Sequence, residues 1–266
     1  MNSNRITEKL REAFGRFNAQ DLNGAERLCG EILQHAPRHP DALHLQGMVR
    51  LAGGNAREAI VLISRALEGN SRNAAMAENL GLAHLAAKEP GEAEHYFRKA
   101  LQLGASHGLL HMRLGLALSL QGKLDEAIAF LKTAAQVNPD DVDTHLNLGN
   151  ALAEAGQVEN AAAAYRKVLA LRPAHVDAYY NLGTLFWRAG QLDDAVGSFQ
   201  NALRHAPGYA DAHHNLGRVY ADQGRLDDAI ACYRRALELE PGQVHSLNSL
   251  GTALLAGGQR EAAAEL

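Results

Sequence analysis

Apolar residues recur at helical spacing in short segments of the chain, and glycine or proline separates these segments. Residues 142–155 show the pattern, because four members of one stripe fall at positions i, i+3, i+4 and i+7: His145, Leu148, Gly149 and Leu152. A turn at Gly156 leads into a second amphipathic segment, residues 159–171, which ends before Pro173. The pattern predicts two antiparallel helices, here called helix A and helix B, joined by a tight turn.

The helix pair is repeated with a fixed period of 34 residues. Glycines follow that step in helix A without insertion or deletion: Gly47, Gly81, Gly115, Gly149, Gly183, Gly217 and Gly251. Alanines follow the same step in helix B: Ala25, Ala59, Ala93, Ala127, Ala161, Ala195, Ala229 and Ala263. Small residues at both places let the two backbones approach closely. Because one pair cannot bury its own apolar stripe, the sequence predicts an all-α solenoid of stacked pairs.

Side chains at fixed places in each copy resemble the signature of the tetratricopeptide repeat family. One copy carries the signature at these residues: Tyr179, Leu182, Gly183, Phe186, Gly190, Ala195, Phe199, Ala202 and Pro207. The resemblance implies a right-handed superhelix of antiparallel helix pairs. It implies a single array over residues 1–266, with seven full repeats and a partial eighth at residues 6–39, 40–73, 74–107, 108–141, 142–175, 176–209, 210–243 and 244–266.

The first three copies depart from this signature. The departures are Glu12 and Gln46 at the leucine position, Cys29 and Ile63 at the aromatic position, and Ser71 and Ala105 at the proline position. We therefore expect the packing and the loops of these copies to differ most from the family pattern.

The printed sequence ends inside helix B of the eighth copy, eight residues after Gly258. A solenoid needs a polar cap at its end, and this unfinished helix B does not provide one. We therefore expect an open apolar face there, formed by Leu247, Leu250, Leu254 and Ala263. The chain is interpreted as part of a longer protein, in which a catalytic domain could follow residue 266. The alternative is a short chain that covers this face by self-association into a homo-oligomer.

Composition limits the classes of partner. The 266 residues carry 26 Lys and Arg against 30 Asp and Glu, so the chain lacks the basic excess that phosphate binding needs, and no nucleic acid is expected. No segment approaches the roughly 20 apolar residues of a membrane span, and the N-terminus lacks a secretory signal. No membrane is therefore expected, and a cytoplasmic protein is predicted. Cys29 and Cys232 have no partner nearby in sequence, which predicts reduced thiols.

A polar pair recurs on helix A, on the side turned away from the stacking stripe. The aspartates are Asp143, Asp177 and Asp211; four residues later stand Asn147, Asn181 and Asn215, and Asn79 extends the asparagine line. An asparagine side chain can bond both the N–H and the C=O of a peptide unit, whatever residue that unit belongs to. The pattern predicts that the inner, concave wall of the superhelix binds a polypeptide in extended conformation. The aspartates would add a preference for hydroxyl or basic side chains.

Each of these residues also has a structural interpretation. An aspartate at the second position of a helix is favoured by the helix dipole and by capping alone. The asparagines could form hydrogen bonds between repeats. Tyr180 and Trp187, on one helix A, are candidates for an aromatic anchor of a bound peptide or for packing between helices.

The paired ladder of repeats 5 to 7 resembles the superhelical domain of the O-linked N-acetylglucosamine transferase family, in which such ladders hold substrate peptides. The resemblance implies a substrate-recognition arm for a glycosyltransferase, and similar arrays are joined to sulfotransferases. Three functions therefore remain: a protein-interaction scaffold that binds extended peptides, the arm of such a transferase, or a self-associating assembly scaffold.

No catalytic motif is present, so this segment is not expected to be an enzyme or to need a cofactor. The chain has neither a phosphate-binding Gly-Lys loop nor a Gly-x-Ser-x-Gly elbow. His107 and His111 are four residues apart, but no third ligand at suitable spacing completes a metal site. A clamp for a peptide carboxylate is disfavoured, because no Lys or Arg stands at the ladder positions of repeats 5 to 7 and Arg113, Arg188 and Arg218 are isolated.

Overall fold

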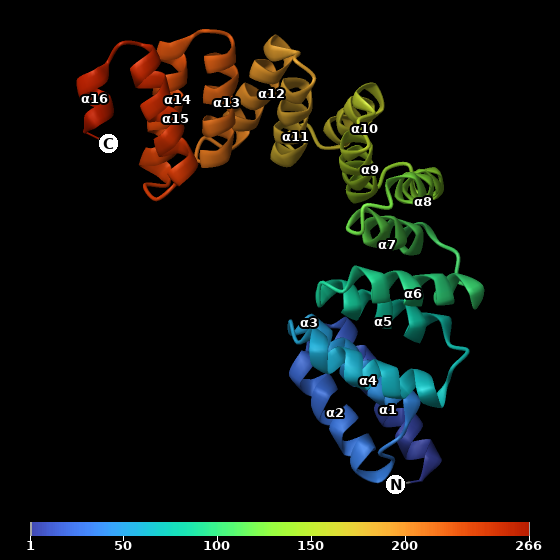
Figure 1. Ribbon diagram of the computed structural model, residues 1–266. Coiled ribbons are helices and arrows are strands. Elements are labelled where there is room, and N and C mark those ends of the chain that lie inside the picture. The colour runs from blue at the N-terminus through green and yellow to red at the C-terminus, as the bar shows by residue number, and fades with distance from the viewer. Residues whose placement is uncertain (1, 266) are drawn as a thin grey trace. The chain divides into compact units, whose positions relative to one another are not determined.

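The computed structural model describes residues 2–265, which contain sixteen α-helices and no strand (Figure 1). The chain divides into two compact units, unit 1 at residues 1–139 and unit 2 at residues 140–266. The helices of unit 1 are α1 (Ser3–Asn18), α2 (Leu22–His35), α3 (Pro40–Ala52), α4 (Ala56–Gly69), α5 (Ala74–Ala86), α6 (Pro90–Gln102), α7 (Gly108–Ser119) and α8 (Leu124–Val137). Those of unit 2 are α9 (Val142–Glu154), α10 (Val158–Leu171), α11 (Val176–Arg188), α12 (Leu192–His205), α13 (Ala210–Asp222), α14 (Leu226–Leu239), α15 (Val244–Ala256) and α16 (Arg260–Ala264). The predicted all-α fold is confirmed.

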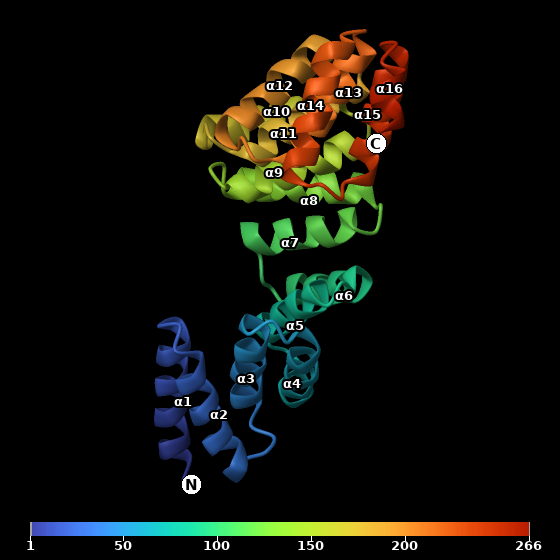
Figure 2. The ribbon, with the colours of Figure 1, turned by 90° about the vertical axis from the view of Figure 1, so that its left-hand side faces the viewer.

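The helices are arranged in pairs. Each odd-numbered helix is a helix A and packs against the helix B that follows it, as Figure 2 shows for α1 with α2 and for α3 with α4. The helices predicted at residues 142–155 and 159–171 are confirmed as α9 and α10. The turn between them requires Gly156, because its φ of +73° lies in the left-handed region that glycine adopts without strain.

The glycine of helix A lies directly under a large side chain of helix B. A Cβ atom added at Gly149 would come within 2.5 Å of the Tyr165 ring, and one added at Gly183 within 2.8 Å of the Phe199 ring. Tyr165 and Phe199 are buried at these crossings. The glycine ladder therefore reflects close approach of the helix A backbone to the ring of helix B.

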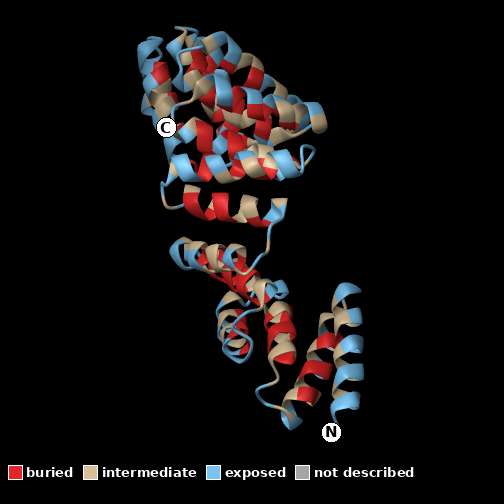
Figure 3. Ribbon diagram, turned by 90° about the vertical axis from the view of Figure 1, so that its right-hand side faces the viewer, coloured by how far each residue is buried: buried red, intermediate tan, exposed pale blue. Residues whose placement is uncertain are grey.

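Helix A is buried on two sides, not only along the predicted stripe. In α11, Leu182 and Phe186 are buried as the stripe predicts, and Ala178 and Leu185 are buried as well. Ala178 shares a core cluster with Val168 of α10, and α10 contacts α11. Helix α11 therefore packs against helix B of its own pair and helix B of the preceding pair. Figure 3 shows the buried faces inside each unit, with exposed residues on the outer turns.

Smaller side chains replace the aromatic residue in the first two repeats and are still fully buried. Ile63 packs against Gly47, where an added Cβ atom would come within 2.5 Å of the isoleucine side chain. Cys29 shares a cluster with Ala13, which stands at the glycine position of its repeat. The departures in unit 1 therefore preserve the packing of helix A against helix B.

The expected open apolar face at the last helices is wrong for two of its four residues. Leu250 is 3% exposed and Leu254 is 1% exposed, because α15 packs between α14 and α16. Leu247 and Ala263 are half-buried. The large apolar side chains that do reach the surface of α15 are Val244 and Leu255.

Candidate functional site

The A helices of unit 2 share a polar surface. Consecutive A helices α9, α11, α13 and α15 are in contact with one another. We call their polar strip the A-helix wall and define it by three ladders of α9, α11 and α13: Asp143, Asp177, Asp211; Asn147, Asn181, Asn215; and Asn150, Thr184, Arg218. The aspartates are exposed, and the asparagines of the middle ladder are half-buried. The structure thus places these six predicted residues at the surface of three adjacent helices.

The asparagine ladder forms hydrogen bonds between repeats. Asn181 Nδ2 donates to Asn150 Oδ1 at 3.0 Å, and Asn215 Nδ2 donates to the Tyr180 hydroxyl at 2.9 Å. In unit 1, Asn79 Nδ2 lies 3.0 Å from His44 Nε2. Each of these contacts occupies one amide N–H of the asparagine, and an amide has a second N–H and an oxygen acceptor. A role between repeats and a role in ligand binding are therefore compatible.

The three aspartates occupy the first turn of their helices, as predicted. Asp211 Oδ1 also accepts a hydrogen bond from Gln243 Nε2 at 2.9 Å. Burial raises the pKa of Tyr209 to about 12, and the nearby charges of Asp177 and Asp211 add to that increase. The aspartate charges therefore act on the aromatic side chains between α11 and α13.

Tyr180 and Trp187 both take part in packing between helices. The Tyr180 ring lies 5.7 Å from the Phe199 ring and 5.0 Å from the Tyr209 ring, measured between centroids. Trp187 is half-buried, and its indole N–H donates to Asp222 Oδ2 at 2.6 Å. These contacts match the packing interpretation of the two residues, and an anchoring role remains a prediction.

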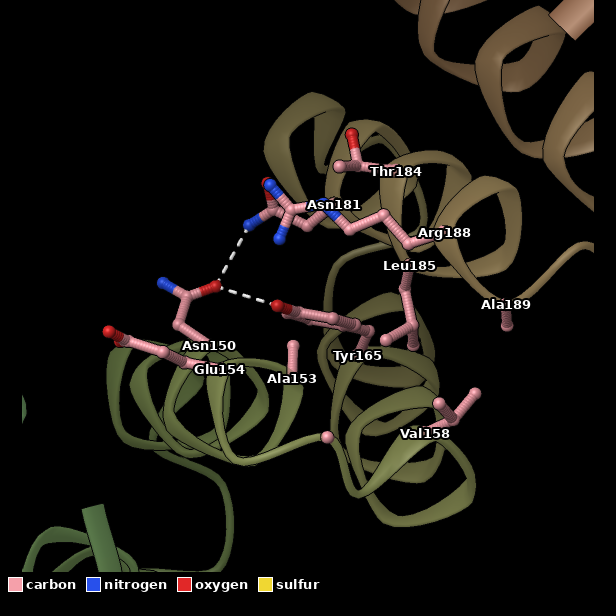
Figure 4. Close-up of a pocket in the computed structure, with 11 residues that line it drawn as sticks. Asn150, Ala153, Glu154, Val158, Tyr165, Asn181, Thr184, Leu185, Arg188 and Ala189 are labelled. Carbon is pink, nitrogen blue, oxygen red and sulfur yellow. Dashed lines mark hydrogen bonds between the residues drawn. The ribbon is translucent and has the colours of Figure 1, made fainter.

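Between α9, α10 and α11 the wall is hollowed by about 510 Å³ (Figure 4). This α9–α11 hollow is lined by Asn150, Ala153, Glu154, Gly156, Val158, Tyr165, Asn181, Thr184, Leu185, Arg188 and Ala189. At its floor the Tyr165 hydroxyl donates to Asn150 Oδ1 at 2.8 Å, so this oxygen accepts from both Tyr165 and Asn181. Burial raises the pKa of Tyr165, which keeps the hydroxyl protonated as a donor.

Asn150 is not among the binding residues predicted from the sequence. Its side chain stands on the same face as Asn147, but the equivalent positions hold Thr184 and Arg218. Asparagine therefore does not recur at this position of helix A. The signal in the sequence is the spacing. Residue 150 lies three positions after Asn147 and therefore on the same face of the helix, although no asparagine recurs there in the next repeats.

A second hollow, of about 310 Å³, lies between α11, α13, α14 and α15. Trp187, Arg218, Asp222, Tyr233 and Asn248 contribute to its lining. The Arg218 guanidinium carbon lies 4.1 Å from the centroid of the Trp187 ring, which is a cation–π contact. The wall thus continues beyond the α9–α11 hollow along unit 2.

The other chemical candidates have structural partners. His107 caps α7 by accepting from the Leu110 N–H, and its Nε2 lies 3.0 Å from Glu78 Oε2. Within residues 2–265 no three metal-ligating side chains are grouped.

Cys29 and Cys232 are free thiols. No helix in the described part of the chain is long and apolar enough to cross a membrane.

Sequence comparison identifies the repeat. A tetratricopeptide repeat model matches residues 44–108, 146–210, 180–244 and 214–266, and a second TPR repeat model matches residues 115–156. These matches cover most of the chain. No curated protein matches it.

Several solved structures have a similar fold. YrrB, described as a TPR protein with an unusual peptide-binding site, is 22% identical, with a TM-score of 0.61 over 70% of this chain and 96% of YrrB. MamA is 30% identical, with a TM-score of 0.54 over 57% of this chain and 89% of MamA. PilF of Pseudomonas aeruginosa is 21% identical, with a TM-score of 0.64 over 79% of this chain and 96% of that protein. At the identities of YrrB and PilF the likeness concerns the fold alone.

Proposed function

This chain belongs to the tetratricopeptide repeat family, and on that premise we propose that unit 2 binds a partner polypeptide in extended conformation on its A-helix wall. The family's scaffold fold is typical of protein–protein interaction. The wall is polar rather than apolar, which suits recognition of a peptide backbone more than burial of an amphipathic helix. The peptide-binding site described for YrrB is a precedent on the same fold.

The spacing of the wall is compatible with an extended ligand. Packed helices lie about 8–10 Å apart, and an extended peptide advances about 3.3 Å per residue. Successive asparagines of the ladder would therefore meet roughly every third residue of the ligand. One amide N–H of Asn181 and of Asn215 is committed between repeats, which orders the side chains before a ligand binds and lowers the entropic cost of binding.

The observation that carries the proposal is the pair Asn150 and Asn181 in the α9–α11 hollow. Their mutual hydrogen bond joins two neighbouring repeats, and both side chains line the same opening (Figure 4). A peptide unit that enters the hollow would meet amide groups from both helices. This arrangement recognises a backbone without demanding one side chain.

A display library of random twelve-residue peptides, panned on the full chain, tests the proposal. We expect capture of peptides by the wild type and at least tenfold weaker binding of the selected peptides by the double variant Asn181→Ala, Asn215→Ala. The expected loss in stability is about 2 kcal/mol, since each of the two hydrogen bonds removed contributes about 1 kcal/mol net. Circular dichroism melting measures that loss.

The matched control is the double variant Asn160→Ala, Asn201→Ala. These asparagines lie on the B helices α10 and α12 and donate locally, to Gln157 Oε1 and to the Gly197 carbonyl. The control should bind the selected peptides as the wild type does. Unchanged binding by the wall variant, together with a large loss in stability, would assign the ladder to contacts between repeats alone.

A further inference from the structure

A chain of buried hydrogen bonds joins helix α13 to helix α15 in unit 2. His214 of α13 is 6% exposed, and its Nδ1 lies 2.8 Å from the hydroxyl oxygen of Ser246, which is fully buried on α15. The Ser246 hydroxyl donates to Gln243 Oε1, and Gln243 Nε2 donates to Asp211 Oδ1 at 2.9 Å. A buried imidazole is thereby connected to an aspartate of the A-helix wall.

The partners in this chain determine where His214 carries its proton. Gln243 Nε2 faces the carboxylates of Asp211 and Glu240, which only accept hydrogen bonds. The other end of this amide, Oε1, is therefore the acceptor for the Ser246 hydroxyl. Since Ser246 has one O–H and donates it to Gln243, its oxygen accepts from the imidazole of His214. The neutral imidazole thus has its proton on Nδ1, and Nε2 is the atom that takes up a second proton in acid.

The surroundings of the His214 ring disfavour a positive charge. The His245 ring of α15 lies edge-on to it at 4.3 Å between centroids, and the Tyr233 ring of α14 lies 5.6 Å away. Burial is the main cause that lowers the pKa of His214 from its ordinary value of 6.5 to about 4. The positive charges of His245 and Arg218 act in the same direction, and the negative charge of Asp211 opposes them.

This shift makes the stability of the α13–α15 contact depend on pH. The unfolded chain binds the second proton more readily, because the ordinary imidazole pKa of 6.5 exceeds the pKa of about 4 in the folded chain. The contribution of neutral His214 to stability is therefore complete above pH 6.5 and is lost as the pH falls from there to about 4. Tyr233, whose pKa burial raises to about 12, stays neutral over this range.

We propose that the contact between α13 and α15 is an acid-sensitive joint, closed while His214 is neutral and open when its Nε2 is protonated. A buried charge needs an ionic partner, and Asp211, the carboxylate that acts on the ring, already accepts from Gln243. The charged ring reaches water only if α15 moves away from α13. Because Gln243 is the N-cap residue of α15, this movement also removes its hydrogen bond to Asp211.

Opening of the joint would alter one end of the A-helix wall. Asp211 and Asn215 both belong to α13, and Asp211 would lose its partner beside α15. The joint concerns the stacking of A helices with or without a bound peptide, so this inference does not rest on the proposed function.

NMR titration of the full chain, with ¹⁵N-labelled histidine, tests the joint at the His214 ring. His214→Asn identifies the ring signal and removes the ionisable group; asparagine already stands at the same position of the next repeat, as Asn248. N-acetyl-histidine N-methylamide in the same sample serves as the reference for an exposed imidazole. We expect His214 to hold one proton, on Nδ1, at pH 5.5, where the reference compound is mostly doubly protonated.

Hydrogen exchange of the α15 amides tests the opening itself. Between pH 7.5 and pH 5.0, after correction for the intrinsic exchange rate, α15 protection in the wild type should fall about tenfold more than in His214→Asn. His205→Gln is the matched control, because it removes an exposed histidine from α12 of the same unit. This control should lose α15 protection as the wild type does.

Titration of His214 together with the reference compound would overturn the joint, and so would equal losses of α15 protection in the wild type and in His214→Asn. A simultaneous loss of protection in every helix of unit 2 would replace the joint by global acid unfolding. If His214→Asn does not fold, the wild-type titration decides by itself, with the ring assigned through its Overhauser contacts to the His245 and Tyr233 rings.

Discussion

The ring of Phe199 crosses helix A at Gly183, and this crossing shows how single residues govern the repeat. A Cβ atom at Gly183 would lie within 2.8 Å of the ring, and Phe199 is fully buried, so the ring has little room to move. The same relation holds for Gly217 and Tyr233. Repetition of glycine at this place therefore has a steric cause.

Gly183→Ala should destabilise the chain by about 1–3 kcal/mol, which is the usual cost of overpacking a filled core. Gly197→Ala is the matched control, because Gly197 lies inside α12 and a Cβ atom there would meet nothing within 4 Å. The control should stabilise by up to about 1 kcal/mol, since alanine favours a helix over glycine. Urea unfolding followed by circular dichroism measures both. Equal effects of the two substitutions would contradict the steric explanation.

At the scale of elements, each helix A in the interior of unit 2 lies between two B helices. Burial of Leu250 and Leu254 shows that α15 follows the same rule, with α14 and α16 as its neighbours. Only part of its apolar surface, including Val244 and Leu255, is exposed. Self-association through α15 would therefore have to use these exposed side chains and not the two buried leucines.

Leu254→Ala should cost about 2–5 kcal/mol, as expected for a fully buried leucine, whereas Leu255→Ala should change stability by less than about 0.5 kcal/mol. Hydrogen exchange of the α14 and α15 amides measures the difference. Sedimentation of Val244→Ser, Leu255→Ser then tests self-association without damage to the core. An oligomer that survives this double change uses another surface, and similar exchange in the two alanine variants would contradict the observed burial.

At the scale of the whole molecule, the described helices of each unit contact helices of their own repeat and of the neighbouring repeats in that unit. Stability of such arrays is approximately a sum of repeat terms and nearest-neighbour terms. A defect in one repeat should consequently spread only a short way along the chain. This locality also allows the A-helix wall to vary from repeat to repeat while the core pattern is kept.

The Gly183→Ala variant also tests this locality. We expect amide protection to fall in α11 and α12 and in the adjacent α10 and α13, because these helices share contacts. Protection in α3 and α4 of unit 1 should remain at the wild-type level. Hydrogen exchange with mass spectrometry of the whole chain gives both results in one experiment. A uniform loss of protection would show that the array unfolds as one cooperative body.

Much of the repeat architecture could be predicted, because its requirements recur every 34 residues. Each predicted feature has a local physical cause that can be read from the repeating sequence. These features are the glycine crossings, the glycine turns and the two amphipathic helices of each pair. The position of the asparagine ladder on the exposed strip of helix A follows from the same periodicity. The helices, their pairing and the face that carries the candidate site could therefore be derived from the amino-acid pattern.

The contacts of the wall residues could be learned only from the packed structure. Asn150 breaks the repeating pattern, yet Tyr165 and Asn181 orient its amide. Arg188 is isolated in sequence but lines one hollow with both asparagines, and Leu250 is covered by packing at α15. Such contacts join side chains of different helices, and their directions depend on how the helices pack. A periodic pattern specifies the face of a helix, whereas the neighbour across that face is set by the stacking of whole repeats.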